Sequence, residues 1–378
     1  MKPPTTRIQG RLVFAIAATS IALHLAGQTL AGETVISPCS CGDDTASIRR
    51  AIAISRSGAI RFQAGVYNLY GSLRLRGNLS YTSARGSWDA HNGSVLVQNT
   101  PGAPIFAVDG QVYSANVTGL TFDGAPGTNA KGVAGANSQS LLATSTIRDS
   151  YFLAGLAEGI DVAMVLTRIE RNQFGVNGGG AVASTRRHIH STFPQAAQNN
   201  ANWVVGNLFR SAQGTESVLF ESGAQLHIEG NDFEANNADT TLRIHGMYHV
   251  VIEGNWFEQN HGQAQMMFGN AQDTGNYIVR LENNHYNLAG FGAPNTCAGN
   301  VVENNCYVFM YEPNKGTATH VYMGYETATN FSPVTELTAN ELTITGYLCL
   351  RGYSGTQAGQ FNNVHEMVIH RVDWGSAA

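Results

Sequence analysis

Apolar and polar residues alternate in short runs along most of this 378-residue chain. Residues 242–244 (LRI), 250–252 (VVI) and 256–257 (WF) show the pattern within one stretch. A period of two is typical of β-strands, whereas an amphipathic helix repeats its apolar positions every three or four residues. The pattern therefore predicts many short strands and an all-β fold.

A repeated unit organises these strands. The sequence HIEGNDFE at residues 227–234 returns as VIEGNWFE at residues 251–258, a shift of 24 residues. Such a period indicates a solenoid, in which each repeat forms one coil that stacks on the next. The aromatic residue of the unit recurs at positions 152, 174, 209, 233, 257, 286 and 307, with gaps between 21 and 35 residues.

Each coil has room for three short strands, which predicts a right-handed parallel β-helix with three sheets. Gly254 allows a sharp bend, and Asn255 behind it can bond nearby main chain. Stacked coils would place the repeated asparagines above one another, so that each amide bonds the next. The aromatic residues would point inward and stack along the core. The predicted ladder comprises Asn172, Asn207, Asn231, Asn255, Asn284 and Asn305.

The segment before the first strands has a helical pattern instead. Ile48, Ala51 and Ile52 have helical spacing, and Asp44 stands where an N-cap is expected. A short amphipathic helix at about residues 43–56 would cover the open end of the solenoid, which otherwise exposes apolar core and strand edges.

The residues around this helix resemble a known family. Residues 42–52 (GDDTASIRRAI), 62–67 (FQAGVY) and 73–75 (LRL) resemble the N-terminal signature of the pectate-lyase-like superfamily of right-handed parallel β-helix proteins, with Gln63 where proline is usual. The resemblance implies the fold and a polysaccharide partner, because the superfamily includes polysaccharide lyases, glycoside hydrolases, epimerases and phage tailspike enzymes. It leaves the reaction open, since one fold hosts many chemistries. Tailspike-like members form trimers, so a trimer is one open oligomeric state.

The N-terminus predicts export. Lys2, Arg7 and Arg11 precede an apolar run over residues 12–26, and small residues near Ala31 fit a cleavage site. Residues 1–31 would then be a secretory signal peptide, and the mature protein would be periplasmic or extracellular. The run is short for a membrane span, and no later stretch is long enough, so no membrane partner is expected.

The mature chain, residues 32–378, is expected to form a single β-helix domain. Regular coils should run from about residue 105 to residue 310, followed by irregular coils over residues 311–378. Signal-peptide cleavage would leave 19 basic and 27 acidic residues, a net charge of −8. Because nucleic-acid binding rests on basic surface, nucleic acid is not an expected partner. An acidic polysaccharide needs only a local basic patch.

The chain contains five cysteines, and export permits disulfides. Cys297 and Cys306 are the favoured pair because they would close a short excursion between two coils. Cys39 and Cys41 stand too close in sequence for an easy bridge. The cysteine spacings match no usual zinc pattern. Calcium is common in related lyases, but no motif here supports it, so no metal or other cofactor is expected.

Counting back from the repeated aromatic residue predicts an outward-facing patch. His245 and Glu221 each stand 12 residues before the aromatic residue of their coil, so they should be neighbours on adjacent strands. Arg243 would share their face, and Asp161 would lie on the corresponding strand of an earlier coil. A long loop, residues 175–201, would overhang this patch. Its candidate substrate-binding residues are Arg187, His188 and His190.

Two reactions fit this patch. In β-elimination on a uronic-acid polymer, Arg243 or Arg187 would neutralise the substrate carboxylate, and His245 or His188 would remove the proton at C5. In glycoside hydrolysis, Asp161 and Glu221 would be the acid and its partner. Elimination by a secreted polysaccharide lyase is the favoured prediction. The remaining alternative is a non-catalytic β-helix that binds polysaccharide or forms a surface structure.

Overall fold

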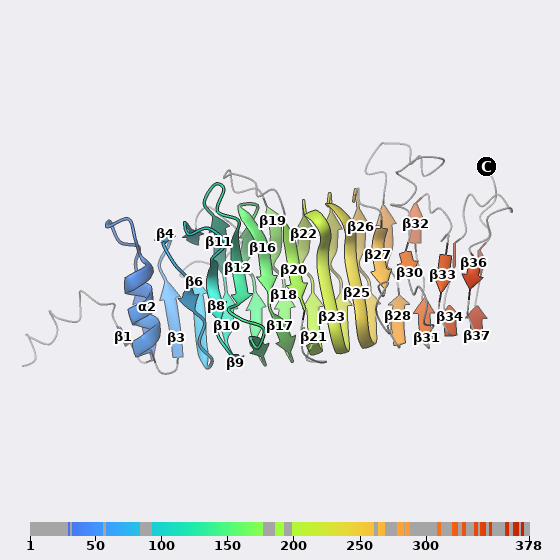
Figure 1. Ribbon diagram of the computed structural model, residues 1–378, viewed down its shortest axis with the longest axis horizontal. Helices are drawn as coiled ribbons and strands as arrows, with labels where there is room; N and C mark the ends of the chain where they lie inside the picture. Colours follow the sequence, from blue (N-terminus) through green and yellow to red (C-terminus); the bar gives the residue numbers. More distant parts are fainter. Residues whose placement is uncertain are drawn as a thin grey trace, which may run out of the picture.

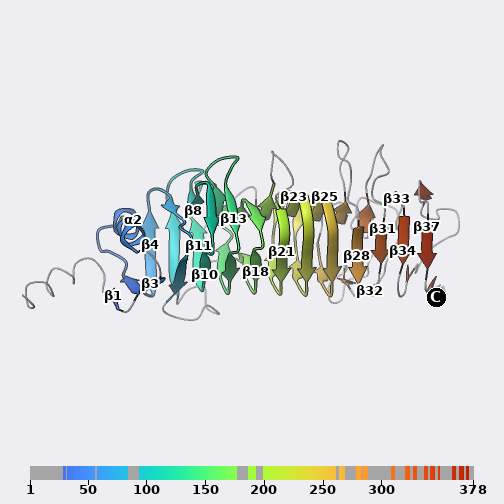
Figure 2. The ribbon, with the colours of Figure 1, turned by 90° about the horizontal axis from the view of Figure 1, so that it is seen from below.

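The computed structural model is a right-handed parallel β-helix, as predicted. Its strands follow one another along a single long axis, and the helix α2 (Thr45–Ile54) covers the N-terminal end (Figures 1 and 2). The structure describes residues 29–30, 32–55, 58–83, 93–176, 186–192, 199–260, 264–268, 278–282 and 284–287, and, beyond these, the strands from β30 onward.

Three faces run along the solenoid, and the first face begins beside α2. Its strands pair in parallel with a stagger of one coil, from the capping helix to the C-terminal end. They are β2 (Glu33–Ile36), β3 (Gly58–Phe62), β6 (Leu79–Ser83), β10 (Asn116–Thr118), β14 (Thr146–Arg148), β18 (Arg168–Glu170), the ends of β21 (Asn199–Val205), β23 (Gln213–Glu229) and β25 (Asn237–Glu253), then β28 (Ile278–Glu282), β31 (His320–Met323), β34 (Glu341–Ile344) and β37 (Glu366–Ile369).

The second face is a separate sheet of ten strands, each three to five residues long. Regular stacking therefore begins before residue 105, because β4 and β7 already pair in register. The strands are β4 (Gly65–Leu69), β7 (Ser94–Gln98), β11 (Leu120–Gly124), β15 (Tyr151–Leu153), β19 (Gln173–Val176), β22 (Leu208–Arg210), β24 (Asp232–Glu234), β26 (Trp256–Glu258), β29 (His285–Asn287) and β32 (Thr327–Thr329).

The third face joins the first through β23 and β25, which run across both. Its strands are β5 (Leu73–Arg74), β8 (Pro104–Val108), β12 (Ala130–Gly135), β16 (Leu156–Asp161), β20 (Arg187–Ser191), the starts of β23 and β25, then β27 (Ala264–Phe268), β30 (Val308–Met310), β33 (Glu336–Thr338) and β36 (Gln360–Asn362). The remaining strands are β1 (Thr29–Leu30), β9 (Gln111–Tyr113), β13 (Leu141–Ala143), β17 (Ala163–Val165), β35 (Leu348–Cys349) and β38 (Val372–Asp373).

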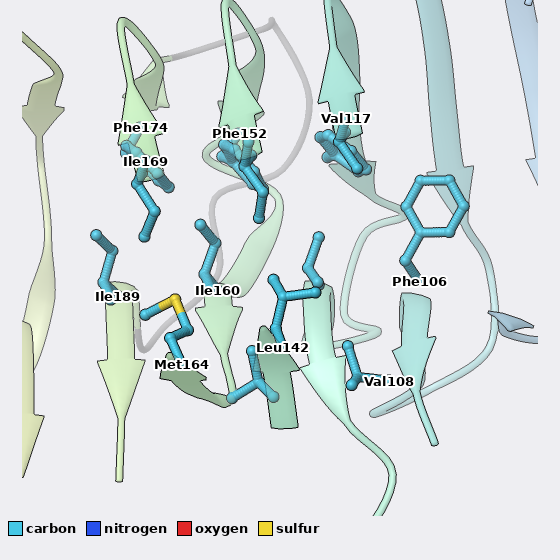
Figure 3. Close-up of a cluster of buried hydrophobic side chains, with 14 of the residues drawn as sticks. Phe106, Val108, Val117, Leu142, Phe152, Ile160, Met164, Ile169, Phe174 and Ile189 are labelled. Atoms are coloured by element: carbon cyan, nitrogen blue, oxygen red, sulfur yellow. The ribbon is translucent and has the colours of Figure 1, made fainter. Parts of the chain in front are cut away.

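Inward side chains of the three faces fill the core. Figure 3 shows Phe152 and Phe174 of the second face directed at Ile160 and Ile189 of the third. The predicted aromatic stack is confirmed from Phe152 to Phe257 and begins one coil earlier, at Phe122, whereas the side chains of Tyr286 and Tyr307 lie outside the described residues. Its successive ring centroids lie 4.5 to 4.9 Å apart, and the stacked rings are Phe122, Phe152, Phe174, Phe209, Phe233 and Phe257. Stacking of this kind stabilises each coil beyond the burial of its apolar area.

The asparagine ladder is confirmed from Asn172 to Asn284. Asn231 is representative: its Nδ2 donates to Val204 O and to Asn255 Oδ1, both at 2.9 Å, and its Oδ1 accepts from Asn207. The preceding glycines turn the chain with left-handed backbone, at φ 63° for Gly254. Asn305 lies outside the described residues. A second, shorter ladder links Asn236 to Asn260 at the next corner of the coil.

The N-terminal cap is confirmed, but its details correct two predictions. The carboxylate of Asp44 accepts from the main chain of Cys39 and Asn68, whereas Asp43 accepts from Thr45 N at 2.9 Å. Asp44 therefore ties the helix to the first coil. Cys39 and Cys41 form a disulfide, and their Cα atoms lie 5.2 Å apart, within the usual range for such bridges. The predicted Cys297–Cys306 pair lies outside the described residues.

Candidate functional site

The third face carries a row of charged side chains from β12 to β25. In these strands two outward positions stand three residues apart, because both residues between them turn toward the core. In β16, for example, Ile160 is fully buried, and a Cβ on Gly159 would lie 2.9 Å from the ring of Phe174. One resulting column contains Lys131, Glu158, Arg187, Glu216 and Thr240, and the other Ala134, Asp161, His190, Leu219 and Arg243.

Four of these groups form a compact cluster, which we call the acid–base cluster: Lys131, Glu158, Asp161 and His190. Lys131 Nζ lies 2.5 Å from Glu158 Oε2 and 2.6 Å from Asp161 Oδ2, so one ammonium bridges two carboxylates. His190 Nδ1 lies 3.2 Å from Asp161 Oδ1 and 3.7 Å from Glu158 Oε1. The Glu158 side chain is only 13% exposed. Low exposure strengthens these charge interactions relative to a pair in open water.

Two arginines continue the row, held by a buried carboxylate. Arg243 donates to Glu216 Oε1 at 2.9 Å, and Arg187 Nε lies 3.8 Å from Glu216 Oε2. The hydroxyl of Thr215 also donates to Glu216. Arg187 additionally lies 3.7 Å from Glu158, which connects the arginines to the acid–base cluster. The Glu216 side chain is only 8% exposed. Its buried carboxylate therefore holds both guanidiniums close to the surface of the third face.

The environment separates the pKa values of the two clustered carboxyls. Burial would raise the pKa of Asp161, but the adjacent His190 ring and the hydrogen bond from Lys131 outweigh it and hold that pKa well below its usual range. Burial, and next the charge of Asp161, raise the pKa of Glu158. The pKa of Lys131 is raised by both carboxylates despite partial burial. The cluster therefore contains one firmly ionised carboxylate and one that is readily protonated.

The same groups have the spacing of metal ligands. One atom each from Glu158, Asp161 and His190 lies within 4.8 Å of the other two. These donors would suit a divalent cation such as calcium or zinc. The ammonium of Lys131 already lies between the two carboxylates and supplies a positive charge there. We therefore keep the expectation of a metal-independent site, and it stays a prediction.

The predicted neighbours Glu221 and His245 are in register on β23 and β25, as the count of 12 residues required. Arg243 stands two residues before His245 on the same strand. Asp161 lies on the predicted face, but its column leads through His190 to Leu219 and Arg243, two positions away from Glu221. The proposed acid–base pair of Asp161 and Glu221 is therefore not formed by adjacent residues of one column. The His245 side chain lies outside the described residues.

The prediction for His188 is wrong. Residues 187–191 form strand β20 of the third face and do not overhang it in a loop. His188 is 3% exposed and points into the core, where its ring lies 5.6 Å from that of Phe209. Its Nδ1 bonds Ser217 Oγ and its Nε2 bonds Arg210 O, both at 2.8 Å. Arg187 and His190, in contrast, lie on the outer face, Arg187 near Glu158 and His190 near Asp161.

Sequence reasoning missed Lys131, Glu158 and Glu216. Each stands three residues before the outward position of the neighbouring column, so strict alternation counted from that position would place it on the opposite side of its strand. A usable signal was present, since Glu158 with Asp161 and Arg187 with His190 repeat one spacing of charged residues on adjacent strands. Two inward residues in succession explain that spacing.

Comparison with known proteins reveals likeness at the level of fold. No family model and no curated protein matches the chain. The tailspike protein of Acinetobacter phage vB_ApiP_P1 is a similar solved structure, with a TM-score of 0.58 and 16% identity over 91% of this chain and 60% of the tailspike. The chain thus spans 60% of the tailspike's length. The chain itself, like these structures, is a right-handed parallel β-helix.

Two further structures have the same architecture. The Streptococcus pneumoniae surface protein and adhesin PfbA has a TM-score of 0.53 and 14% identity, with 90% of this chain and all of that chain covered. A DFA-IIIase from Arthrobacter chlorophenolicus A6, solved without its lid in complex with GF2, has a TM-score of 0.53 and 11% identity, with 89% and 98% covered. Such low identity supports the fold and leaves the reaction to be argued from the site. Among the described residues, no helix is long and apolar enough to span a membrane.

Proposed function

We propose that this protein cleaves an acidic polysaccharide by β-elimination on its third face. The observation that carries the proposal is the contact of His190 with Asp161, with Arg187 and Arg243 in the same row. An ionised carboxylate beside Nδ1 favours the tautomer with a proton on Nδ1, which leaves the lone pair on Nε2. A histidine held in this way is a suitable base near neutral pH.

The reaction would proceed with the following balance. An arginine neutralises the carboxylate of a uronic-acid residue, which acidifies the proton at C5. His190 Nε2 takes that proton, the electron pair forms the C4–C5 double bond, and the C4–O bond breaks. Glu158, whose pKa is raised by burial, can protonate the leaving oxygen. Of the groups first considered, His245 and Arg243 stay candidates for substrate contact.

Glycoside hydrolysis by the same carboxylates is less well supported. A retaining enzyme needs two carboxyl groups about 5 Å apart with the scissile bond between them. Here the ammonium of Lys131 lies between Glu158 and Asp161, within 2.6 Å of each. The similar tailspike and DFA-IIIase structures support a carbohydrate partner in general.

Ultraviolet absorbance of the unsaturated product tests this proposal. The mature protein is incubated with polygalacturonate, alginate, hyaluronan and heparan sulfate, and the product is followed with time. We expect a rise with one of them, its loss in H190A, and its retention in H227A, which alters a half-buried histidine of the first face. New reducing ends without absorbance would indicate hydrolysis, and binding without either product would indicate a non-catalytic binder.

The proposal includes export of the protein. The basic and apolar pattern of residues 1–31 supports cleavage near Ala31 and a location outside the cytoplasm. N-terminal sequencing of the protein recovered from culture medium or periplasm tests this. A chain that keeps Met1 and stays with the cytosolic fraction would contradict it.

A further inference from the structure

The second face carries a different patch, which we call the tryptophan patch: Leu208, Arg210, Asp232, Glu234, Trp256 and Glu258. Phe209, Phe233 and Phe257 occupy the middle position of β22, β24 and β26 and point into the core. The residues on either side of each phenylalanine therefore face outward. Register places Leu208, Asp232 and Trp256 in one column and Arg210, Glu234 and Glu258 in the next. Neighbouring rungs of such columns lie about 4.8 Å apart.

Trp256 is a partly exposed aromatic residue on this face, followed in its column by His285 of β29. It is 37% exposed, and its indole N–H donates to Glu258 Oε2 at 3.0 Å. That hydrogen bond fixes the ring against its own strand. A partly exposed tryptophan suits a ligand that is itself flat and partly apolar, because stacking on it removes apolar area from water at little cost in side-chain entropy.

Asp232 lies beside this ring in an unusual environment for a carboxyl group. Leu208 and Trp256 flank it within its column, and its Oδ1 is buried without a hydrogen-bond partner among the described residues. Burial, followed by the charges of Glu234 and Glu258, raises the pKa of Asp232 to about 6. Near neutral pH this group therefore exists in both protonation states, and it can donate or accept a hydrogen bond. Protonation removes the negative charge from this buried group and so lowers the cost of its burial.

The charge of the tryptophan patch excludes anionic ligands. The patch has three carboxyls and one guanidinium, and that guanidinium, of Arg210, is paired with Glu234. Anionic sugars would be repelled here, in contrast to the row of cations on the third face. A neutral pyranose combines an apolar face that can stack on an indole with hydroxyls that can bond carboxylates.

We infer that the tryptophan patch is a glycan-binding site for uncharged pyranose units, stacked on Trp256 with hydroxyls bonded to Asp232 and Glu258. It lies on another face of the solenoid from the acid–base cluster, so it does not depend on the proposed elimination. It would hold the protein on a neutral glycan or on the neutral residues of a mixed polymer.

Isothermal titration calorimetry of the mature protein tests the inference. The probes are cellohexaose, xylohexaose, maltohexaose and chitohexaose, with oligogalacturonate as the acidic comparison. We expect at least one uncharged probe to bind, and W256A to weaken that binding about tenfold, a loss equal to about 1.4 kcal/mol. W256F should retain part of the affinity. Y113A is the matched control, because Tyr113 is an exposed aromatic residue on β9.

Three results would overturn the inference: no binding of any uncharged probe at millimolar concentration, equal affinity of W256A and the unaltered protein, or preferential binding of oligogalacturonate that W256A abolishes. Unchanged melting temperatures of the variants establish that they fold. H190A should bind the uncharged probe normally, which separates this site from the proposed catalytic one.

Discussion

Asp161 and His190 face each other in register on strands β16 and β20, with Asp161 Oδ1 3.2 Å from His190 Nδ1. The carboxylate is ionised and the imidazole is half-buried, so in the proposed mechanism the base is oriented before substrate binds. A carboxylate that orients a base lowers the barrier to proton transfer, and the carboxylate itself does not exchange a proton in that step.

The first prediction concerns this pair. Asp161→Asn should keep the shape of the site but lose the charge that holds the imidazole tautomer. We expect kcat for elimination to fall by about 10²–10⁴-fold with little change in KM. Asp109→Asn, which removes an exposed partner of Arg74, is the matched control and should leave kcat unchanged. Equal rates for both variants would exclude a role of Asp161 in orienting the base.

The second prediction concerns Lys131, which bridges Glu158 and Asp161. Lys131→Met leaves two part-buried carboxylates facing each other, which should lower the free energy of unfolding at pH 7 by about 1–3 kcal/mol. Without the ammonium the pKa of both carboxyls rises. Folding then favours proton uptake, so part of the lost stability should return as the pH is lowered to about 5. Urea unfolding at both pH values measures this.

Arg61→Met is the control for Lys131, because Arg61 forms a more exposed ion pair with Glu33. Its loss should cost less than about 1 kcal/mol. A loss of stability in Lys131→Met that stays constant from pH 7 to pH 5 would mean that packing of the lysine stem, and not its charge, stabilises the third face.

The third prediction concerns the asparagine ladder. Asn231→Ala removes an amide that bonds both neighbouring coils and leaves several buried main-chain and amide groups without partners. We expect a loss of about 2–4 kcal/mol in the free energy of unfolding. Asn237→Ala, at an exposed position one coil corner away, should change it by less than about 0.5 kcal/mol. Similar losses in both variants would contradict a special contribution of the ladder.

The fourth prediction concerns His188. Complete burial lowers the pKa of His188 to about 3, from an ordinary value of 6.5. Below pH 6.5 the unfolded chain therefore binds a proton at His188 that the folded chain does not bind. The contribution of His188 to the free energy of unfolding is fully present above that pH and is lost as the pH drops toward 3. His188→Phe removes this proton, and the free energy of unfolding should change less between pH 7 and pH 4.5 than in the unaltered protein.

The bonds of His188 to Ser217 and Arg210 complicate its absolute effect, because their loss costs stability at every pH. The dependence on pH is therefore the informative quantity. An unchanged slope in His188→Phe would mean that other groups cause the acid sensitivity.

The fifth prediction concerns Asp232, whose pKa of about 6 lies above its ordinary value of 3.8. The folded protein holds a proton here that the unfolded chain releases, so stability rises as the pH falls through 6 and is complete below 3.8. Asp232→Asn should stabilise the protein at pH 7 by about 1–2 kcal/mol, allowing for partial exposure. Asp239→Asn, at an exposed position, should have no effect. Calorimetric melting at pH 7 and pH 4 compares them.

The sequence predicted the fold because its repeat has direct physical meaning. A glycine that permits left-handed backbone, an asparagine that bonds the next coil and an inward phenylalanine can recur together only if coils stack. Where no insertion interrupts the count, prediction extended to single residues, as for Glu221 and His245. With a constant repeat length, the number of a residue in the sequence determines its position in the sheet.

The site was harder to predict because it lies beside the interrupted coils. The insertion between Phe174 and Phe209 hid strand β20, so His188 was assigned to a loop although its ring packs in the core. Residues 159 and 160 both point toward the core, which breaks the alternation of inward and outward positions. Alternation alone therefore did not predict that Glu158 faces outward. Cys39 and Cys41 show a similar limit, since closeness in sequence does not reveal whether the local backbone brings two sulfur atoms together.

The constant offset of 24 residues between β23 and β25 has a consequence for how this chain could change in length. Excision of residues 231–254 would join Gly230 to Asn255, which restores the Gly-Asn step of the intact chain. Every later strand would meet a neighbour of the same shape, and no new apolar surface would be exposed. Unequal recombination could therefore add or remove a whole coil in one event. The length of the solenoid could therefore change by whole coils, while the side chains on either side of the junction keep their positions in the sheets.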